Sequence, residues 1–108
     1  MSDYSLGEFE ELVLLVVAAN HNEAYGVLIL QELEEKLKKK VNISAIHVAL
    51  KRMEHKGFVE SKFGGITNER GGRRKKYYAI TAFGKKVLDQ QYELRTSIYQ
   101  QIPQISFS

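Results

Sequence analysis

Residues 71–84 read GGRRKKYYAITAFG, and this stretch decides the fold. Gly71 and Gly72 describe a turn, the four cations and two tyrosines after them favour a basic β-strand, and Thr81 has a side chain suited to cap a helix. A turn, a basic strand and a new helix in that order are how a DNA-binding wing is built. A run of cations alone is more often a solvated surface, so this interpretation depends on the neighbouring segments.

A second strand is expected just upstream, from residues 58 to 63. Gly64 and Gly65 then open a loop, which Gly71 and Gly72 close before a strand from about Arg74 to Ile80. The two strands predict a hairpin with a long, basic tip.

Three helices are predicted ahead of the hairpin. Residues 8–19 predict a buried helix whose second half is apolar on nearly all sides. Its acidic residues fall in the first turn, where the helix dipole favours negative charge. Residues 25–37 have helical apolar spacing and run into the lysine cluster at 38–40. The third helix has two candidate N-caps, Asn42 and Ser44, of which Ser44 is preferred, and it stops at Gly57.

The third helix has two different faces. Ile46, Leu50 and Met53 make an inward stripe. The opposite face is short, polar and basic, so it could enter a major groove. It carries Ser44, Val48, Lys51 and His55, with His47 and Arg52 on its flanks.

A long helix is predicted from Thr81 toward Ile102, limited by Pro103. It carries two adjacent apolar stripes, more than so small a core can cover. The surplus predicts a partner helix, most simply that of a second subunit, although a helix folded back on its own domain is the alternative. The residues expected at this dimer interface are Phe9, Leu12, Val87, Leu88, Tyr92, Leu94, Ile98, Tyr99 and Ile102.

Length and composition set further bounds. At 108 residues the chain is one structural domain, which we divide into a winged helix-turn-helix (residues 1–80) and a dimerisation helix with its tail (residues 81–108). The lack of cysteine excludes disulfides and thiolate sites and fits a cytoplasmic protein. The longest apolar run, residues 12–19, is too short to span a membrane, and no metal or cofactor motif is found.

The charge is divided sharply along the chain. Residues 1–35 hold eight acids and no lysine or arginine, whereas all 16 cations fall in residues 36–108. A basic half on a short domain is typical of a protein that binds a polyanion, although an uneven solvated surface is the simpler alternative.

Four segments together resemble the PadR family of bacterial transcriptional regulators, in its smaller subgroup with one C-terminal helix. They are Leu6-Gly7, Ala24-Tyr25-Gly26, the stretch from Leu50 to Val59, and the stretch from Gly71 to Thr81 with Gly84. The resemblance implies a mainly α winged helix-turn-helix with a small β-hairpin and a long C-terminal dimerisation helix. The chain departs from the family at His47-Val48, where members usually have tyrosine followed by proline or threonine.

Candidate DNA contacts on the helices each have a simpler alternative. Lys51 could reach a phosphate or a guanine edge, or it could be a solvated lysine. His47 could bond a base edge or make a structural hydrogen bond, and Val48 could touch a thymine methyl or be merely exposed. Tyr25, at the start of the second helix, could hold a phosphate or be a buried aromatic. Arg52 is expected to pair with Glu54 or another acid of the domain.

The wing offers four more candidates. Strand alternation should direct neighbouring side chains to opposite faces, so we expect either Arg73 with Lys75 or Arg74 with Lys76 to contact DNA. Alternation also places one of Tyr77 and Tyr78 in the core, without indicating which.

The leading hypothesis is a homodimeric, sequence-specific regulator, more often a repressor, that binds double-stranded DNA at a palindromic operator. A small hydrophobic or aromatic effector at the dimer interface could relieve repression. The alternative is a winged-helix module that binds an acidic protein partner. An enzyme is the least supported reading, because no nucleophile motif or ligand spacing is present.

Overall fold

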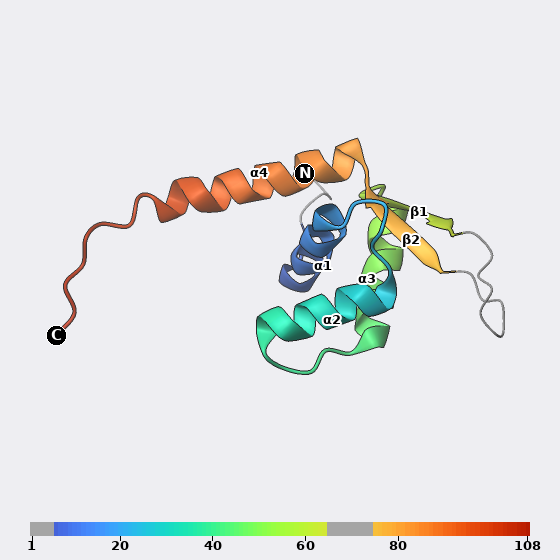
Figure 1. The fold of residues 1–108 in the computed structure, drawn as a ribbon. Coiled ribbons are helices and arrows are strands. Elements are labelled where there is room, and N and C mark those ends of the chain that lie inside the picture. Colours follow the sequence, from blue (N-terminus) through green and yellow to red (C-terminus); the bar gives the residue numbers. More distant parts are fainter. Residues whose placement is uncertain (1–5, 65–74) are drawn as a thin grey trace.

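Three helices, a two-stranded hairpin and a long C-terminal helix follow one another along the chain (Figure 1). The computed structural model describes residues 6–64 and 75–108. This order confirms the winged helix-turn-helix predicted from the sequence. The elements are α1 (Glu8–Ala19), α2 (Gly26–Leu37), α3 (Ile43–His55), β1 (Val59–Phe63), β2 (Lys76–Ile80) and α4 (Ala82–Tyr99).

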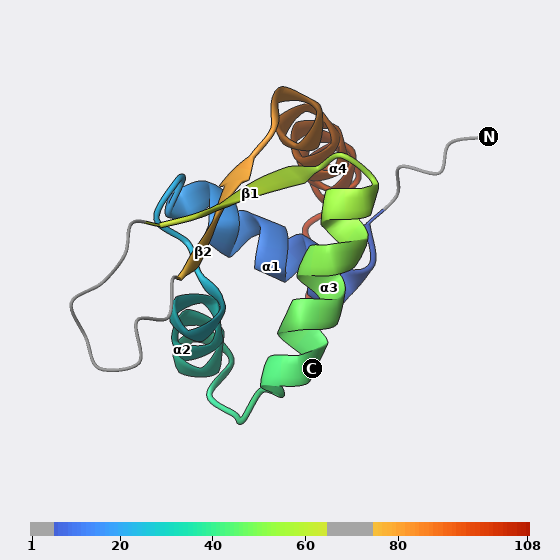
Figure 2. The ribbon, with the colours of Figure 1, turned by 90° about the vertical axis from the view of Figure 1, so that its right-hand side faces the viewer.

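Helix α1 forms the centre of the fold. It packs against α2, α3, β2 and the first half of α4, and Figure 2 shows these elements grouped around it. The apolar second half of α1 explains this position, because a helix with few polar side chains must be covered on most sides. The largest fully buried side chains are Leu14 and Val17 of α1 with Ile29, Ile46, Leu50, Met53 and Phe58.

The link between α2 and α3 corrects one prediction. Helix α3 begins at Ile43, and its N-cap is Asn42, whose side chain accepts a hydrogen bond of 2.7 Å from the Ser44 N–H. The preference for Ser44 as the cap was therefore wrong. Asn42 has an extended backbone, from which its short amide reaches the N–H two residues further on.

Strands β1 and β2 pair antiparallel, with Val59 opposite Ile80 and Phe63 opposite Lys76. Each strand is slightly shorter than predicted. Ala24 forms an isolated bridge with Tyr78, whose N–H donates to the Ala24 carbonyl at 2.8 Å. Tyr78 is the buried member of the tyrosine pair, whereas Tyr77 is half-buried.

Helix α4 starts from a joint that holds it against the core. Thr81 is the N-cap, as predicted, and its hydroxyl oxygen accepts a 2.9 Å hydrogen bond from the Gly84 N–H. Gly84 is buried, and a Cβ there would collide with the backbone carbonyl of Phe58. Val87 and Leu88 are buried against the core. The glycine thus lets the first turn of α4 approach Phe58 closely.

Beyond Gln91 the chain leaves the core, and we call residues 92–108 the C-terminal arm. The helix ends at Tyr99 instead of Ile102, and after a turn at residues 100–101 the chain continues without regular secondary structure (Figure 1). Within the single chain, the arm exposes a series of large apolar side chains. They are Tyr92, Leu94, Ile98, Tyr99, Ile102, Ile105 and Phe107.

Candidate nucleic-acid interface

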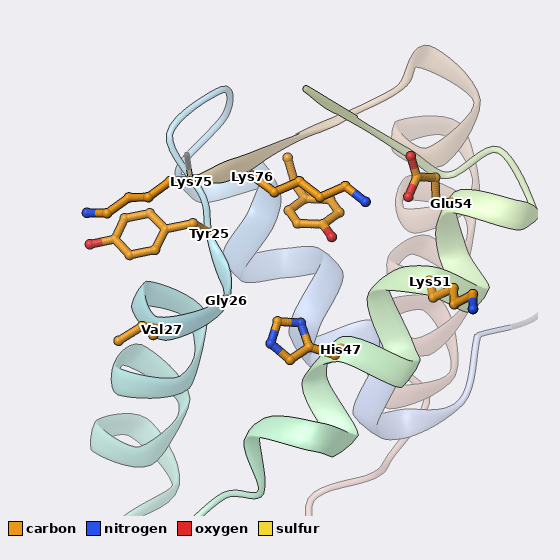
Figure 3. A pocket seen from close by; sticks show the side chains of 9 residues that line it. Tyr25, Gly26, Val27, His47, Lys51, Glu54, Lys75 and Lys76 are labelled. Atoms are coloured by element: carbon orange, nitrogen blue, oxygen red, sulfur yellow. The ribbon is translucent and has the colours of Figure 1, made fainter. Parts of the chain in front are cut away.

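A cleft of about 530 Å³ lies between the N-terminus of α2, the helix α3 and the start of β2 (Figure 3). We call it the basic cleft. Three elements that are distant in sequence contribute to it, and five of its residues are DNA contacts predicted from the sequence. Its lining residues are Tyr25, Gly26, Val27, His47, Lys51, Glu54, Lys75, Lys76 and Tyr78.

The α2 end of the cleft is an open helix N-terminus. Tyr25 is the N-cap residue in extended conformation, and its side chain does not cap the helix. The first N–H groups of a helix carry positive partial charge and can bind an anion. His47 projects from α3 toward Gly26 (Figure 3), and a Cβ at Gly26 would lie only 2.9 Å from the imidazole Cε1. The glycine therefore gives His47 room against α2.

The two lysines at the start of β2 point in different directions (Figure 3). The Lys75 Nζ lies 4.3 Å from the centroid of the Tyr25 ring, whereas the Lys76 Nζ lies 5.9 Å from that of Tyr78. Both nevertheless line the basic cleft. The alternation of side chains along the strand therefore directs the two lysines to different aromatic rings, but both remain in the cleft. Arg73 and Arg74 lie outside the described residues.

An acid and a tyrosine complete the cleft next to the wing. Glu54 of α3 accepts a 2.6 Å hydrogen bond from the Ser61 hydroxyl of β1. Burial raises the pKa of Tyr78, and the negative charge of Glu54 raises it further. The cleft therefore combines three lysines and a histidine with one carboxylate, an environment that suits an anionic ligand such as a phosphate.

The remaining predicted residues of α3 lie outside the cleft. Ser44 and Val48 are exposed on the helix surface. Arg52 pairs with a buried acid, as predicted, and this acid is Glu10 of α1, at 3.7 Å. Lys56 approaches the same carboxylate at 3.9 Å, so the basic end of α3 is linked to α1.

The residues predicted at the dimer interface fall into three groups. Phe9 and Leu12 are half-buried and line an apolar groove beside Leu37. Val87 and Leu88 are covered by their own domain. The third group is exposed on the arm and consists of Tyr92, Leu94, Ile98, Tyr99 and Ile102.

Sequence reasoning missed the places of Glu54 and Gly26 in the cleft. Glu54 follows His47 and Lys51 at helical spacing, so the pattern could have placed it on the same face. Gly26 matters through its contact with His47, a residue of a distant segment, and the sequence has no local signal for that contact.

Within residues 6–64 and 75–108, no helix is long and apolar enough to cross a membrane. No group of three or more metal-ligating side chains there is placed to hold an ion.

A winged helix-turn-helix with a basic cleft beside its third helix defines a class of DNA-binding proteins. Residues 13–90 match the Transcriptional regulator PadR-like family, and the chain belongs to that family. It is therefore a transcriptional regulator of a non-enzymatic, DNA-binding family, as the sequence predicted.

The chain is also similar to several solved structures and to a curated protein. The protein smu.1704 of Streptococcus mutans UA159 is 31% identical, with 84% of this chain and 77% of that chain covered and a TM-score of 0.63. RosR of h. salinarum is 26% identical, with 92% and 82% covered and a TM-score of 0.72. The PadR-like transcriptional regulator BC4206 of Bacillus cereus, at 21% identity, 91% and 93% coverage and a TM-score of 0.68, shows the shared fold.

The curated relative is an uncharacterized protein X of Lysinibacillus sphaericus. It is 29% identical over 91 residues, which cover 82% of this chain and 79% of the relative.

Proposed function

We propose that this regulator is a cytoplasmic, homodimeric repressor that binds a palindromic operator through the basic cleft and the exposed face of α3. The observation that carries the proposal is the convergence of the α2 N-terminus, Lys51 of α3, Lys75 just before β2 and Lys76 of β2 on one cleft. These are the groups that bind phosphate in protein–DNA interfaces.

In the proposed complex, α3 lies in the major groove and the cleft faces one phosphate backbone. His47 and Val48 read base edges, and Ser44 with Lys51 contacts bases or phosphates. Tyr25 and Lys75 bind a phosphate at the start of α2. Lys76, with Arg73 and Arg74 of the wing, extends the contact along the backbone or into the minor groove.

The C-terminal arm is proposed to pair with the arm of a second copy. Leu94, Ile98 and Ile102 are each more than half exposed in the single chain, which supports this pairing. Phe9 and Leu12 border the same interface in the proposal. Two α3 helices would then face half-sites about one DNA turn apart.

Titration of the regulator's own promoter DNA at several salt concentrations tests the proposal. A dimer that neutralises about six to eight phosphates should show a log–log salt slope of about −5 to −7 and resist random competitor DNA. A slope near zero would contradict DNA binding. Weak, length-dependent binding would instead favour the alternative of a basic module for an acidic protein partner.

We also propose that a small hydrophobic or aromatic effector binds at the dimer interface and relieves repression. Tyr92 and Tyr99 are exposed on the arm and would contribute to such a site. Titration with aromatic compounds should quench tyrosine fluorescence and weaken operator binding together. No change in either would count against the effector.

A further inference from the structure

Three aromatic and cationic side chains form a cluster where the wing meets α2. The Tyr25 ring has the Lys75 Nζ over it at 4.3 Å, and the Tyr77 ring packs edge-on against it, with centroids 5.7 Å apart and an interplanar angle of 81°. Tyr25 is thus held by Tyr77 while it contacts Lys75.

The backbone around this cluster is also fixed. The Gly64 N–H donates to the Lys75 carbonyl at 2.7 Å, and the Tyr78 N–H donates to the Ala24 carbonyl at 2.8 Å. The Tyr77 ring occupies the space that a side chain at Gly64 would need. The base of the wing is therefore attached to the segment that opens α2.

This arrangement matters for Lys75 because a lysine side chain has many rotamers. Binding a phosphate restricts these rotamers at a cost in free energy. A lysine that already rests on an aromatic face has lost part of this freedom before DNA binds. Edge-to-face aromatic packing in turn holds the ring that carries the lysine.

We propose that Tyr77 is a positioning residue for DNA binding. It fixes the Tyr25 ring, and the ring holds the Lys75 ammonium next to the open N-terminus of α2, where a backbone phosphate binds. Tyr77 itself does not contact DNA in this arrangement. The inference rests on the proposed function, because it names how one cation of the cleft is presented to its ligand.

A double-mutant cycle in the full-length protein tests the inference. Tyr77→Ala should weaken operator binding about tenfold in the wild-type background but by less than about twofold in a Lys75→Met background, because the residues act through one contact. Tyr77→Phe keeps the ring and should restore binding. Lys86→Met, an exposed lysine of α4 outside the cleft, is the matched background in which the full loss should remain.

Equal losses in the Lys75→Met and Lys86→Met backgrounds would overturn the proposal, since a merely structural role does not depend on Lys75. Thermal melts of each variant measure any change in folding separately.

A second measurement needs no DNA. In the free protein, the Lys75 side-chain protons should show an upfield ring-current shift that is lost in Tyr77→Ala and kept in Tyr77→Phe. An unshifted Lys75 in the wild type would overturn the proposal. A shifted Lys75 in a protein that does not bind its promoter would contradict the proposed function, and with it the role of Tyr77 in DNA binding, but would leave the contact between Lys75 and the Tyr25 ring in place.

Discussion

The basic cleft and the C-terminal arm differ in whether their side chains find partners within the same chain. In the cleft, Lys75 rests on Tyr25 and Glu54 is bonded by Ser61, so one chain assembles the site. On the arm, Leu94 and Ile98 are 60% and 56% exposed. Apolar side chains gain free energy only when they leave water. One chain therefore assembles the basic cleft by itself, whereas the apolar side chains of the arm stay in water unless another surface covers them.

The two regions are joined by the first half of α4. Val87 and Leu88, in this half, are buried against the core. Further along the helix, the Gln91 side chain donates a hydrogen bond to the Glu11 carboxylate at 2.8 Å, and Arg95 forms an ion pair with Glu11 at 3.1 Å. One continuous helix therefore connects the core to the arm. In a dimer, a change in how the arms pack would be transmitted to the spacing of the two clefts, which is the route proposed for an effector.

The largest effect should come from charging the arm with Leu94→Glu combined with Ile98→Glu. Two buried carboxylates at a dimer interface are costly, so the protein should become monomeric. Without the second half-site, operator affinity should fall by at least about 100-fold. Sedimentation measures the oligomeric state, and promoter titration measures the affinity.

Gln90→Glu, an exposed position on the same helix, is the control and should change neither result. A double variant that remains dimeric would show that the arm is not the interface. A monomeric variant with unchanged affinity would show that the cleft works alone.

The next largest effect should come from a substitution at Gly84, where the start of α4 meets the core. Gly84→Ala places a methyl group against the Phe58 carbonyl and forces the start of α4 away from the core, at a cost of about 2 kcal/mol in the free energy of unfolding. Denaturant unfolding measures this loss. Gly7→Ala is the control, because its Cβ would meet no atom within 4 Å. Equal stabilities would mean that the joint can relax without cost.

The fold could be predicted from sequence because its signals are local and repeated. The nearly continuous apolar run with acids in its first turn predicted α1, and Thr81 indicated the start of α4. The error at α3 arose because both Asn42 and Ser44 are good capping residues. Only the extended backbone at Asn42, with its side-chain bond to the Ser44 N–H, decides between them.

For the candidate site, the sequence predicted the cationic side chains and Tyr25 but not the contacts among them. The residue types and the face of α3 predicted Lys51 and His47, and the basic strand predicted Lys75 and Lys76. The sequence has no local signal for the contact between Tyr77 and Tyr25, because segments 52 positions apart meet only in the folded chain. The same holds for the space that Gly26 provides for His47.

A smaller effect is expected within the cleft from Lys76→Met. Removing one phosphate contact per subunit should weaken binding to operator and random DNA about equally, by about tenfold for the dimer, and should reduce the salt slope by about two. Titrations at several salt concentrations measure both quantities. Lys86→Met is the control and should leave the slope unchanged. A loss confined to the operator would instead place Lys76 at a base edge.

The smallest effect on stability at neutral pH should come from Tyr78→Phe. This variant also tests whether water reaches the Tyr78 hydroxyl in the cleft. Burial and Glu54 raise the pKa of Tyr78 above its usual 10.0, so the fold favours the neutral phenol. This contribution to stability is fully present below about pH 10 and is lost as the pH rises through the pKa of the folded protein, because the unfolded chain then binds fewer protons.

Tyr78→Phe should therefore match the wild type at pH 7 within about 0.5 kcal/mol, since no hydrogen bond of the hydroxyl is found among the described residues. Above pH 10 the wild type should lose stability faster than the variant, as measured by denaturant unfolding at each pH. If the wild type and Tyr78→Phe lost stability in parallel above pH 10, the Tyr78 hydroxyl would be hydrated in the folded protein, and the cleft would be open to water around it.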